Sequence, residues 1–178
     1  TMTVPTIDGT LNDYIWTLAD EESLLFGGVP EQWDEEWTNW TDNLVTWKAA
    51  WSEVTNKVYV AITIKDDIRG EFDNNNPITP YYDDSIELFI DGDNSGGYYE
   101  GTYNQSQQWW ISGEGKTILD DFPNSSNRQF YTDNKIITAV SWGANGNWTC
   151  EVELEIYNTF PFSRSEEHTS ELQSLLII

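Results

Sequence analysis

The sequence predicts an all-β protein, an antiparallel β-sandwich. Three observations favour this class. Several segments alternate apolar and polar residues with a period of two, turns rich in Gly, Asn and Pro separate them, and no segment keeps a 3.6-residue period over three turns. Short strands without intervening helices are typical of two packed antiparallel sheets. With 38% hydrophobic and 15% aromatic residues, the 178-residue chain can bury one sandwich core.

The first three predicted strands lie in the N-terminal half. LVTWKAAW at 44–51 is rich in β-branched and aromatic residues. KVYVAITI at 57–64 alternates strictly, and its inward positions are Val58, Val60, Ile62 and Ile64. SIELFID at 85–91 repeats that alternation with Ile86, Leu88 and Ile90 facing inward. Before these strands, EQWDEEWTNW at 31–40 fits at most one helical turn within a connection.

Three more strands are predicted in the C-terminal half, at 107–112, 135–142 and 148–157. The last, WTCEVELEIY, is the clearest of all because it alternates over its whole length. One face is apolar and is expected to be buried, with Trp148, Cys150, Val152, Leu154 and Ile156. The other face is expected to be solvated, with Glu151, Glu153 and Glu155.

The net charge of the chain limits the kinds of molecule it is expected to bind. The chain has 8 Lys and Arg residues against 31 Asp and Glu residues, a formal net charge of -23. Such a surface repels phosphate backbones and anionic lipids, so we expect no nucleic-acid and no membrane partner. No segment has the ~18 consecutive apolar residues of a membrane span. We expect a monomer, with Cys150 as a small buried hydrophobe rather than a nucleophile.

The ten tryptophans are the other compositional signal. Trp16 is assigned to the core. Trp47 and Trp51 are four residues apart on one strand and therefore share a face. Trp109 and Trp110 are adjacent on a strand, so one of them must point outward. An outward tryptophan either stacks on a ligand or is covered by a loop.

Four segments, taken in order, resemble a known family. They are TIDGTLNDYIW from Thr6, KVYVAITIKDD from Lys57, YYDDSIELFIDGDNSGGYY from Tyr81, and NGNWTCEVELEIYNTFPF from Asn145. The chain resembles the carbohydrate-binding module family 9-like domains over roughly 4–162, and DDSIELFID is the specific part. The resemblance implies a DOMON-like β-sandwich, a non-catalytic sugar-binding module of a secreted, extracellular and often multidomain bacterial protein, which can carry a glycoside hydrolase domain elsewhere.

The resemblance also implies site residues. In sugar-binding members two aromatic rings clamp a terminal sugar, because an aromatic face suits the apolar C–H patch of a pyranose. It places one ring at Tyr81, followed by Tyr82, and a hydroxyl acceptor at Glu87. The family's arginine falls on Trp110, a departure that removes a charged donor, and Trp110 or Trp109 then extends the stacking platform. The second clamp ring has no counterpart here.

The sequence also contains candidate ligands for calcium and for haem. DGDNSGG from Asp91 places oxygen-bearing side chains at alternate positions before glycine, which suits Ca²⁺, with Asp91 and Asp93 as ligand candidates. Family members carry structural calcium; a tight turn is the alternative. Related sandwich domains bind haem through Met, His or Lys. Because Met2 lies at the edge of the sequence and His168 lies in the tail, we expect no haem.

The tail itself is unusual. RSEEHTSELQS, from Arg164 to Ser174, resembles a translated sequencing adapter. We therefore predict that 1–162 is a truncated sandwich from a metagenomic fragment, and that 163–178 is a non-native tail from adapter read-through. A genuine polar tail with a hydrophobic end is the alternative. If the tail comes from an adapter, the sandwich lacks its last strand and exposes an unpaired strand edge. We do not expect Leu175 to Ile178 to cover that edge.

Two other function classes stay open. A structural or adhesion domain that has lost sugar binding is favoured by the departure at Trp110 and the missing second ring. A glycosidase needs two carboxylates facing each other across a bond. With 31 acidic residues, pairs such as Asp66-Asp67, Asp83-Asp84 and Asp120-Asp121 are unavoidable. Solvated turns and strand ends are the favoured interpretation of these pairs.

Overall fold

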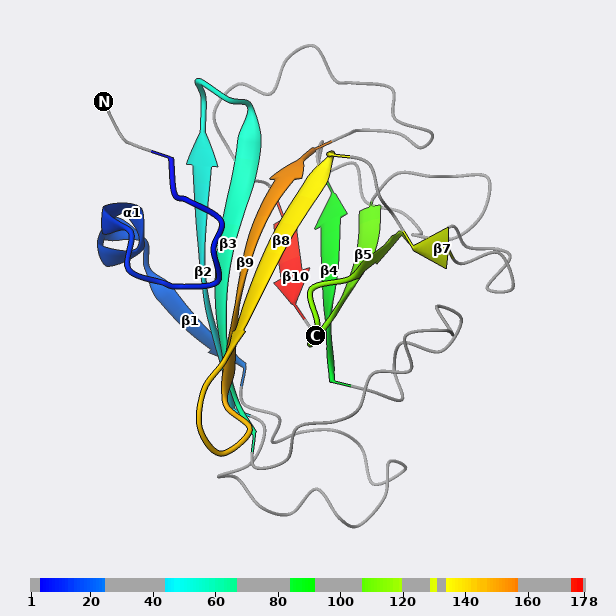
Figure 1. The fold of residues 1–178 in the computed structure, drawn as a ribbon. Helices are drawn as coiled ribbons and strands as arrows, with labels where there is room; N and C mark the ends of the chain where they lie inside the picture. The colour runs from blue at the N-terminus through cyan, green and yellow to red at the C-terminus, as the bar shows by residue number, and fades with distance from the viewer. Residues whose placement is uncertain are drawn as a thin grey trace.

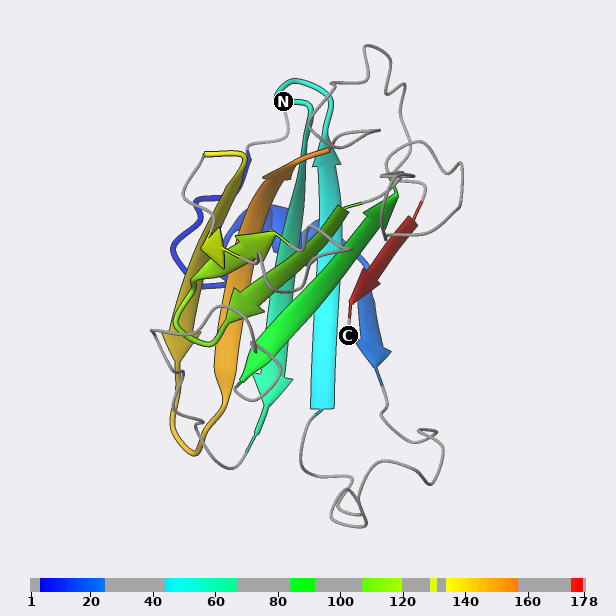
Figure 2. The same cartoon turned by 90° about the vertical axis from the view of Figure 1, so that its right-hand side faces the viewer.

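A computed structural model of the chain describes residues 4–24, 44–66, 84–91, 107–119, 129–130, 134–156 and 174–177. In these ranges two five-stranded antiparallel sheets face each other, which confirms the predicted sandwich (Figures 1 and 2). The six predicted strands are all present, and their bounds shift by no more than two residues.

The first sheet contains the longest strands and has the order β1-β2-β3-β9-β8. Every neighbouring pair in it is antiparallel. Its strands are β1 (Glu21–Leu24), β2 (Leu44–Ser52), β3 (Lys57–Lys65), β9 (Trp148–Glu155) and β8 (Ile136–Trp142). The second sheet has the order β10-β4-β5-β6-β7. Its strands are β10 (Ser174–Ile177), β4 (Ser85–Asp91), β5 (Gln107–Ser112), β6 (Thr117–Leu119) and β7 (Gln129–Phe130).

The main core lies between the two sheets and follows the period-two pattern. The expected inward residues of β3, β4 and β9, and Ile156 directly after β9, are all buried: Val58, Val60, Ile62, Ile64, Ile86, Leu88, Ile90, Trp148, Cys150, Val152, Leu154 and Ile156. Burial strongly raises the pKa of the Cys150 thiol, as expected for a packed hydrophobe and not for a nucleophile. Trp47 and Trp51 both pack against this core, which confirms that they share a face.

A second, smaller core lies on the opposite face of the first sheet. The N-terminal segment 4–20, which contains the helix α1 (Tyr14–Leu18), crosses this face (Figure 1). Ile15 and Trp16 of α1 pack there on Tyr59 and Ala61 of β3. Trp16 is therefore a core residue, as predicted. The five-residue helix was missed because one turn is too short to show a helical period.

Glu151 corrects one prediction. The acidic face of β9 was expected to be solvated, but Glu151 is completely buried. Its Oε2 accepts hydrogen bonds from the backbone N–H groups of Asp8 (3.0 Å) and Gly9 (2.9 Å). Its Oε1 accepts one from the indole Nε1 of Trp16 (2.8 Å). Because each donor replaces water on the carboxylate, the buried charge is tolerated, and the N-terminal segment is tied to β9.

The Ile-Asp-Gly stretch at residues 7–9 is shaped for this contact. Gly9 has φ +82°, a conformation that L side chains rarely adopt. A Cβ at Gly9 would also lie only 3.0 Å from the carbonyl carbon of Val140. Thr149 Oγ1 donates to the Gly9 carbonyl (2.7 Å), and Asp8 Oδ1 accepts from Thr10 N (2.7 Å). Glycine is therefore required where the chain touches β8 and β9.

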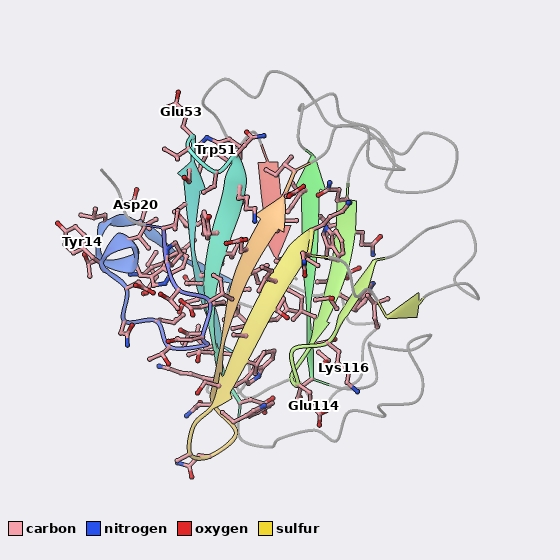
Figure 3. All side chains as sticks on the ribbon, turned by 45° about the horizontal axis from the view of Figure 1, so that its top comes forward. Tyr14, Asp20, Trp51, Glu53, Glu114 and Lys116 are labelled. Carbon is pink, nitrogen blue, oxygen red and sulfur yellow. The ribbon has the colours of Figure 1, made fainter. Side chains whose placement is uncertain are left out.

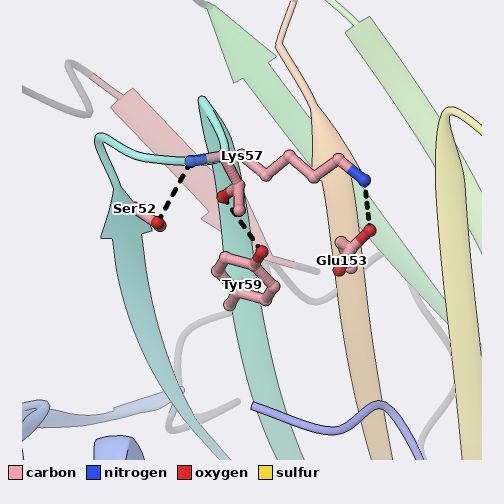
Figure 4. Close-up of polar contacts among 5 residues, drawn as sticks. Ser52, Lys57, Tyr59 and Glu153 are labelled. Carbon is pink, nitrogen blue, oxygen red and sulfur yellow. Dashed lines mark hydrogen bonds and ion pairs between the residues drawn. The ribbon is translucent and has the colours of Figure 1, made fainter. Parts of the chain in front are cut away.

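The other two acids of β9 are only half-buried. Glu153 pairs with Lys57 of β3, and their hydrogen bond raises the pKa of that lysine (Figure 4). The Tyr59 hydroxyl lies 3.1 Å from Thr55 Oγ1, and burial raises its pKa. These contacts fasten the β2–β3 turn to the first sheet.

The two sheets are also joined along one side. The hairpin between β5 and β6, which carries Glu114 and Lys116, lies across the sandwich from the N-terminal segment with Tyr14 and Asp20 (Figure 3). Trp142 Nε1 of β8 donates to the Gly113 carbonyl of this hairpin (2.6 Å). The Trp142 ring stacks on Trp148, with ring centroids 5.3 Å apart.

The tail contributes a strand that was not expected. Residues 174–177 form β10, which pairs with β4 from Ser174 opposite Asp91 to Ile177 opposite Leu88. An unpaired edge is a template for any extended segment, and consecutive aliphatic residues such as Leu175–Ile177 suit a strand. The expectation that this segment leaves the edge of β4 open is therefore wrong. Its origin from an adapter stays a prediction.

Candidate functional site

The outward face of β4 and β5 brings several predicted site residues together. Ile86, Leu88 and Ile90 point into the core, so Glu87 and Phe89 lie on the opposite face of β4. On β5 the same alternation places Gln108 and Trp110 outward. The strand register sets Glu87 opposite Trp110 and Phe89 opposite Gln108. The result is a small polar and aromatic surface on the second sheet.

Glu87 is held in place by a neighbour that sequence reasoning did not assign to the site. The Gln108 side-chain Nε2 donates a hydrogen bond to Glu87 Oε1. Gln108 lies two residues before Trp110, so both project from the same face of β5 beside Glu87. Period two and the pairing of β4 with β5 are the signals that could have identified it. This bond orients a half-buried carboxylate toward the outer face.

The two adjacent tryptophans of β5 have opposite environments. Trp109 is completely buried in the core between the sheets. It therefore cannot form a stacking platform, and the prediction that included it in the sugar site is wrong. Trp110 is half-buried on the outer face and pairs with Ile118 of β6 as well as with Glu87. Trp110 is the ring of this pair that a ligand can reach.

Several predicted residues lie outside the described part of the chain. These are Tyr81 and Tyr82 before β4, Asp93 after it, Met2 and His168. Asp91 is the last residue of β4. Among the described residues, no three His, Cys, Asp or Glu side chains gather where they could hold a metal ion. The sugar clamp at Tyr81 and the calcium ligands therefore stay predictions.

Within the described ranges, no helix is both long and apolar enough to cross a bilayer.

Two antiparallel sheets packed face to face, with a half-buried acid, amide and indole on one outer face, define the class as a β-sandwich domain. The sequence pattern of the carbohydrate family 9 binding domain-like family matches residues 7–172. Because this match spans most of the chain, the protein belongs to that family. No curated protein matches the sequence.

Two solved structures share the fold. Both are carbohydrate-binding modules of family 9 from Caldicellulosiruptor kristjanssonii, one in complex with cellotriose and one with glucose. The first has a TM-score of 0.60 and 17% identity, and the match covers 88% of this chain and 66% of that one. The second has a TM-score of 0.58 and 16% identity, covering 89% and 68%. This chain thus spans about two thirds of their length, and at these identities the likeness establishes the fold.

Proposed function

We propose that this protein is a non-catalytic carbohydrate-binding module, and that the outer face of β4 and β5 binds the sugar. The observation that carries the proposal is the Glu87 carboxylate, held by Gln108 beside the outward indole of Trp110. Membership of the family supports the ligand class, and the two similar structures were solved with cellotriose and glucose. Ligand sites commonly combine aromatic or apolar surface with a few polar groups that fix the orientation of the ligand.

Each side chain has a defined role in this proposal. Tyr81 is the proposed stacking ring, and the Trp110 indole extends this platform with a flat apolar face for the C–H side of a pyranose. The Glu87 carboxylate accepts hydrogen bonds from sugar hydroxyls, which are stronger than bonds between neutral groups. Gln108 fixes the orientation of that carboxylate, so less entropy is lost when the sugar binds. The net charge of -23 favours a neutral sugar over an anionic one.

Replacing Glu87 with alanine is expected to weaken cellotriose binding by about 10- to 100-fold, because charged hydrogen bonds contribute about 1.5–3 kcal/mol. Tyr81→Ala is expected to cost about 1–3 kcal/mol if its ring is a hot spot. Isothermal titration calorimetry measures both. Glu53→Ala, an exposed change in the β2–β3 turn, is the control and should leave the affinity unchanged.

The same titration distinguishes a sugar-binding module from a structural or adhesion domain that has lost sugar binding. If the wild-type protein is folded and binds neither cellotriose nor glucose, the structural or adhesion domain is the better assignment. The observation in its favour is Trp110 where sugar-binding relatives are expected to have an arginine. If Glu87→Ala binds as the wild type does, the site lies elsewhere.

We further propose a structural calcium ion at Asp91 and Asp93, next to the end of β4. Removal of calcium with EDTA is expected to lower the Tm by about 5–10 °C, since a ligand at 100 times its Kd stabilises a fold by ~2.7 kcal/mol. Thermal unfolding with and without calcium measures this shift. Asp93→Ala should abolish it, and equal Tm values for the wild-type protein in EDTA and in calcium would contradict the proposal.

The proposed setting is extracellular, in a longer protein that can carry a catalytic domain. The acidic surface supports a monomer that stays soluble through charge repulsion.

A further inference from the structure

The first sheet has a cavity of its own, on the face away from the second sheet. Its volume is about 270 Å³. Leu11 and Trp16 of the N-terminal segment form one wall. Thr46 and Lys48 of β2, with Ala61 and Thr63 of β3, form the opposite wall. None of these residues belongs to the surface around Glu87 on β4 and β5.

The walls of this cavity are held firmly. The Trp16 indole donates to the fully buried Glu151, so its ring has a fixed orientation. Lys48 Nζ spans the two walls, because it donates to the Trp16 carbonyl (2.9 Å) and lies 3.7 Å from Glu21 Oε2. A cavity whose walls are already ordered loses little entropy when a ligand enters.

The wall formed by β2 and β3 carries two hydroxyl groups. Thr46 and Thr63 are directly opposite each other in the register of β2 and β3, on the face that lines the cavity. Both are half-buried, and neither hydroxyl has a hydrogen-bond partner in the part of the chain that the structure describes. A threonine hydroxyl both donates and accepts, as a sugar hydroxyl does. The next pair along the strands, Lys48 opposite Ala61, adds a charged donor beside a small apolar surface.

The chemistry of the lining selects the ligand. The charges of Lys48 and Glu21 are paired, so the lining does not favour a charged ligand. The volume is slightly below the ~300–1,000 Å³ of pockets for drug-sized ligands, which fits a single ring. Apolar surface from Leu11 and Trp16 faces hydroxyls from Thr46 and Thr63, and a pyranose likewise has an apolar side and a hydroxylated rim.

We propose that this cavity is a second binding site, which takes one neutral sugar ring. The proposal rests on the proposed function only for the class of ligand. It gives the module two binding faces, one on each sheet, so that two sugar units or two chains can be held at once. Two linked sites raise the apparent affinity for a polymer without any new contact.

The test is a titration of the ¹⁵N-labelled protein with D-glucose, followed by two-dimensional NMR. The backbone amides of Ala61 and Thr63 report on the cavity, and those of Glu87 and Gln108 report on the second sheet. We expect saturable shifts at Ala61 and Thr63. The double variant Thr46→Val and Thr63→Val keeps the side-chain shape but removes both hydroxyls. It should raise the Kd for glucose, measured from these shifts, by about 5- to 100-fold.

A matched control and the pattern of shifts decide the result. The double variant Thr46→Ser and Thr63→Ser keeps both hydroxyls and should bind as the wild type does. Shifts confined to Glu87 and Gln108 would overturn the cavity site and leave the proposed function standing. Shifts confined to Ala61 and Thr63 would support the cavity site and overturn the proposed sugar site on β4 and β5. Unchanged binding by the valine variant, if its spectrum shows a folded protein, would also overturn the cavity site.

Discussion

Replacing Glu151 with alanine is expected to lower the free energy of unfolding by about 3–5 kcal/mol. The change leaves three donors without their acceptor, namely the N–H groups of Asp8 and Gly9 and the Trp16 indole. Each buried donor without a partner costs ~1–3 kcal/mol, and the Asp8 amide is only partly buried, so the lower part of the summed range applies. Urea unfolding followed by tryptophan fluorescence measures the difference.

A graded series sharpens this test. Glu151→Gln keeps one oxygen, so it can satisfy either the two backbone amides or the indole, and an intermediate loss is expected. Glu155→Gln changes a half-buried acid on the same strand and face but keeps its shape and one acceptor oxygen, and it should alter the stability by less than about 1 kcal/mol. Hydrogen exchange in Glu151→Ala should rise first over residues 4–20. Equal stability of the Glu151→Ala and Glu155→Gln variants would show that the N-terminal segment is held by other contacts.

Replacing Trp109 with alanine is expected to cost about 3–5 kcal/mol, the usual range for removing a large aromatic residue from a core. Trp109 has no exposed surface, and it packs among the aliphatic residues between the two sheets. Its indole Nε1 donates a long hydrogen bond to Gln107 Oε1 (3.5 Å), and removal of the packed ring is expected to account for most of the cost. Chemical unfolding measures this loss directly.

Trp110→Ala is the matched comparison, because it removes the same side chain from the next position on the opposite face. We expect a loss of stability of about 1 kcal/mol, together with weaker binding of cellotriose. The pair therefore separates a core role from a binding role. A larger loss of stability in Trp110→Ala than in Trp109→Ala would contradict the assignment of the two faces of β5.

Local pattern was enough to predict β2, β3, β4, β5, β8 and β9, but not the short strands β1, β6, β7 and β10. Side chains in a strand alternate between its faces, so the alternation of apolar residues in β3, β4 and β9 was enough to predict which of them face the core between the sheets. The inward position of Cys150 and the shared face of Trp47 and Trp51 follow from the same period. The motif around Glu87 also indicated the family, and with it the sandwich.

Contacts between distant segments could not be predicted in this way. Glu151 looks like its neighbours Glu153 and Glu155 in sequence, and only the return of residues 8 and 9, 142 positions earlier for Gly9, buries it. Alternation shows that Trp109 and Trp110 face opposite ways, but it does not show which face the other sheet covers. The pairing of Gln108 with Glu87 depends on the register of β4 and β5.

The sequence by itself thus determined the six longest strands, their two-faced character and the family, because these depend on patterns of residues that lie close together in the sequence. The tertiary structure alone decided which acid of β9 is buried, which of the two adjacent tryptophans of β5 lies on the outer face, and which segment pairs with the edge of β4. The physical reason is that the burial of a side chain depends on which other segment of the chain packs against it. A charged or aromatic side chain has the same local pattern whether water or another segment lies above it.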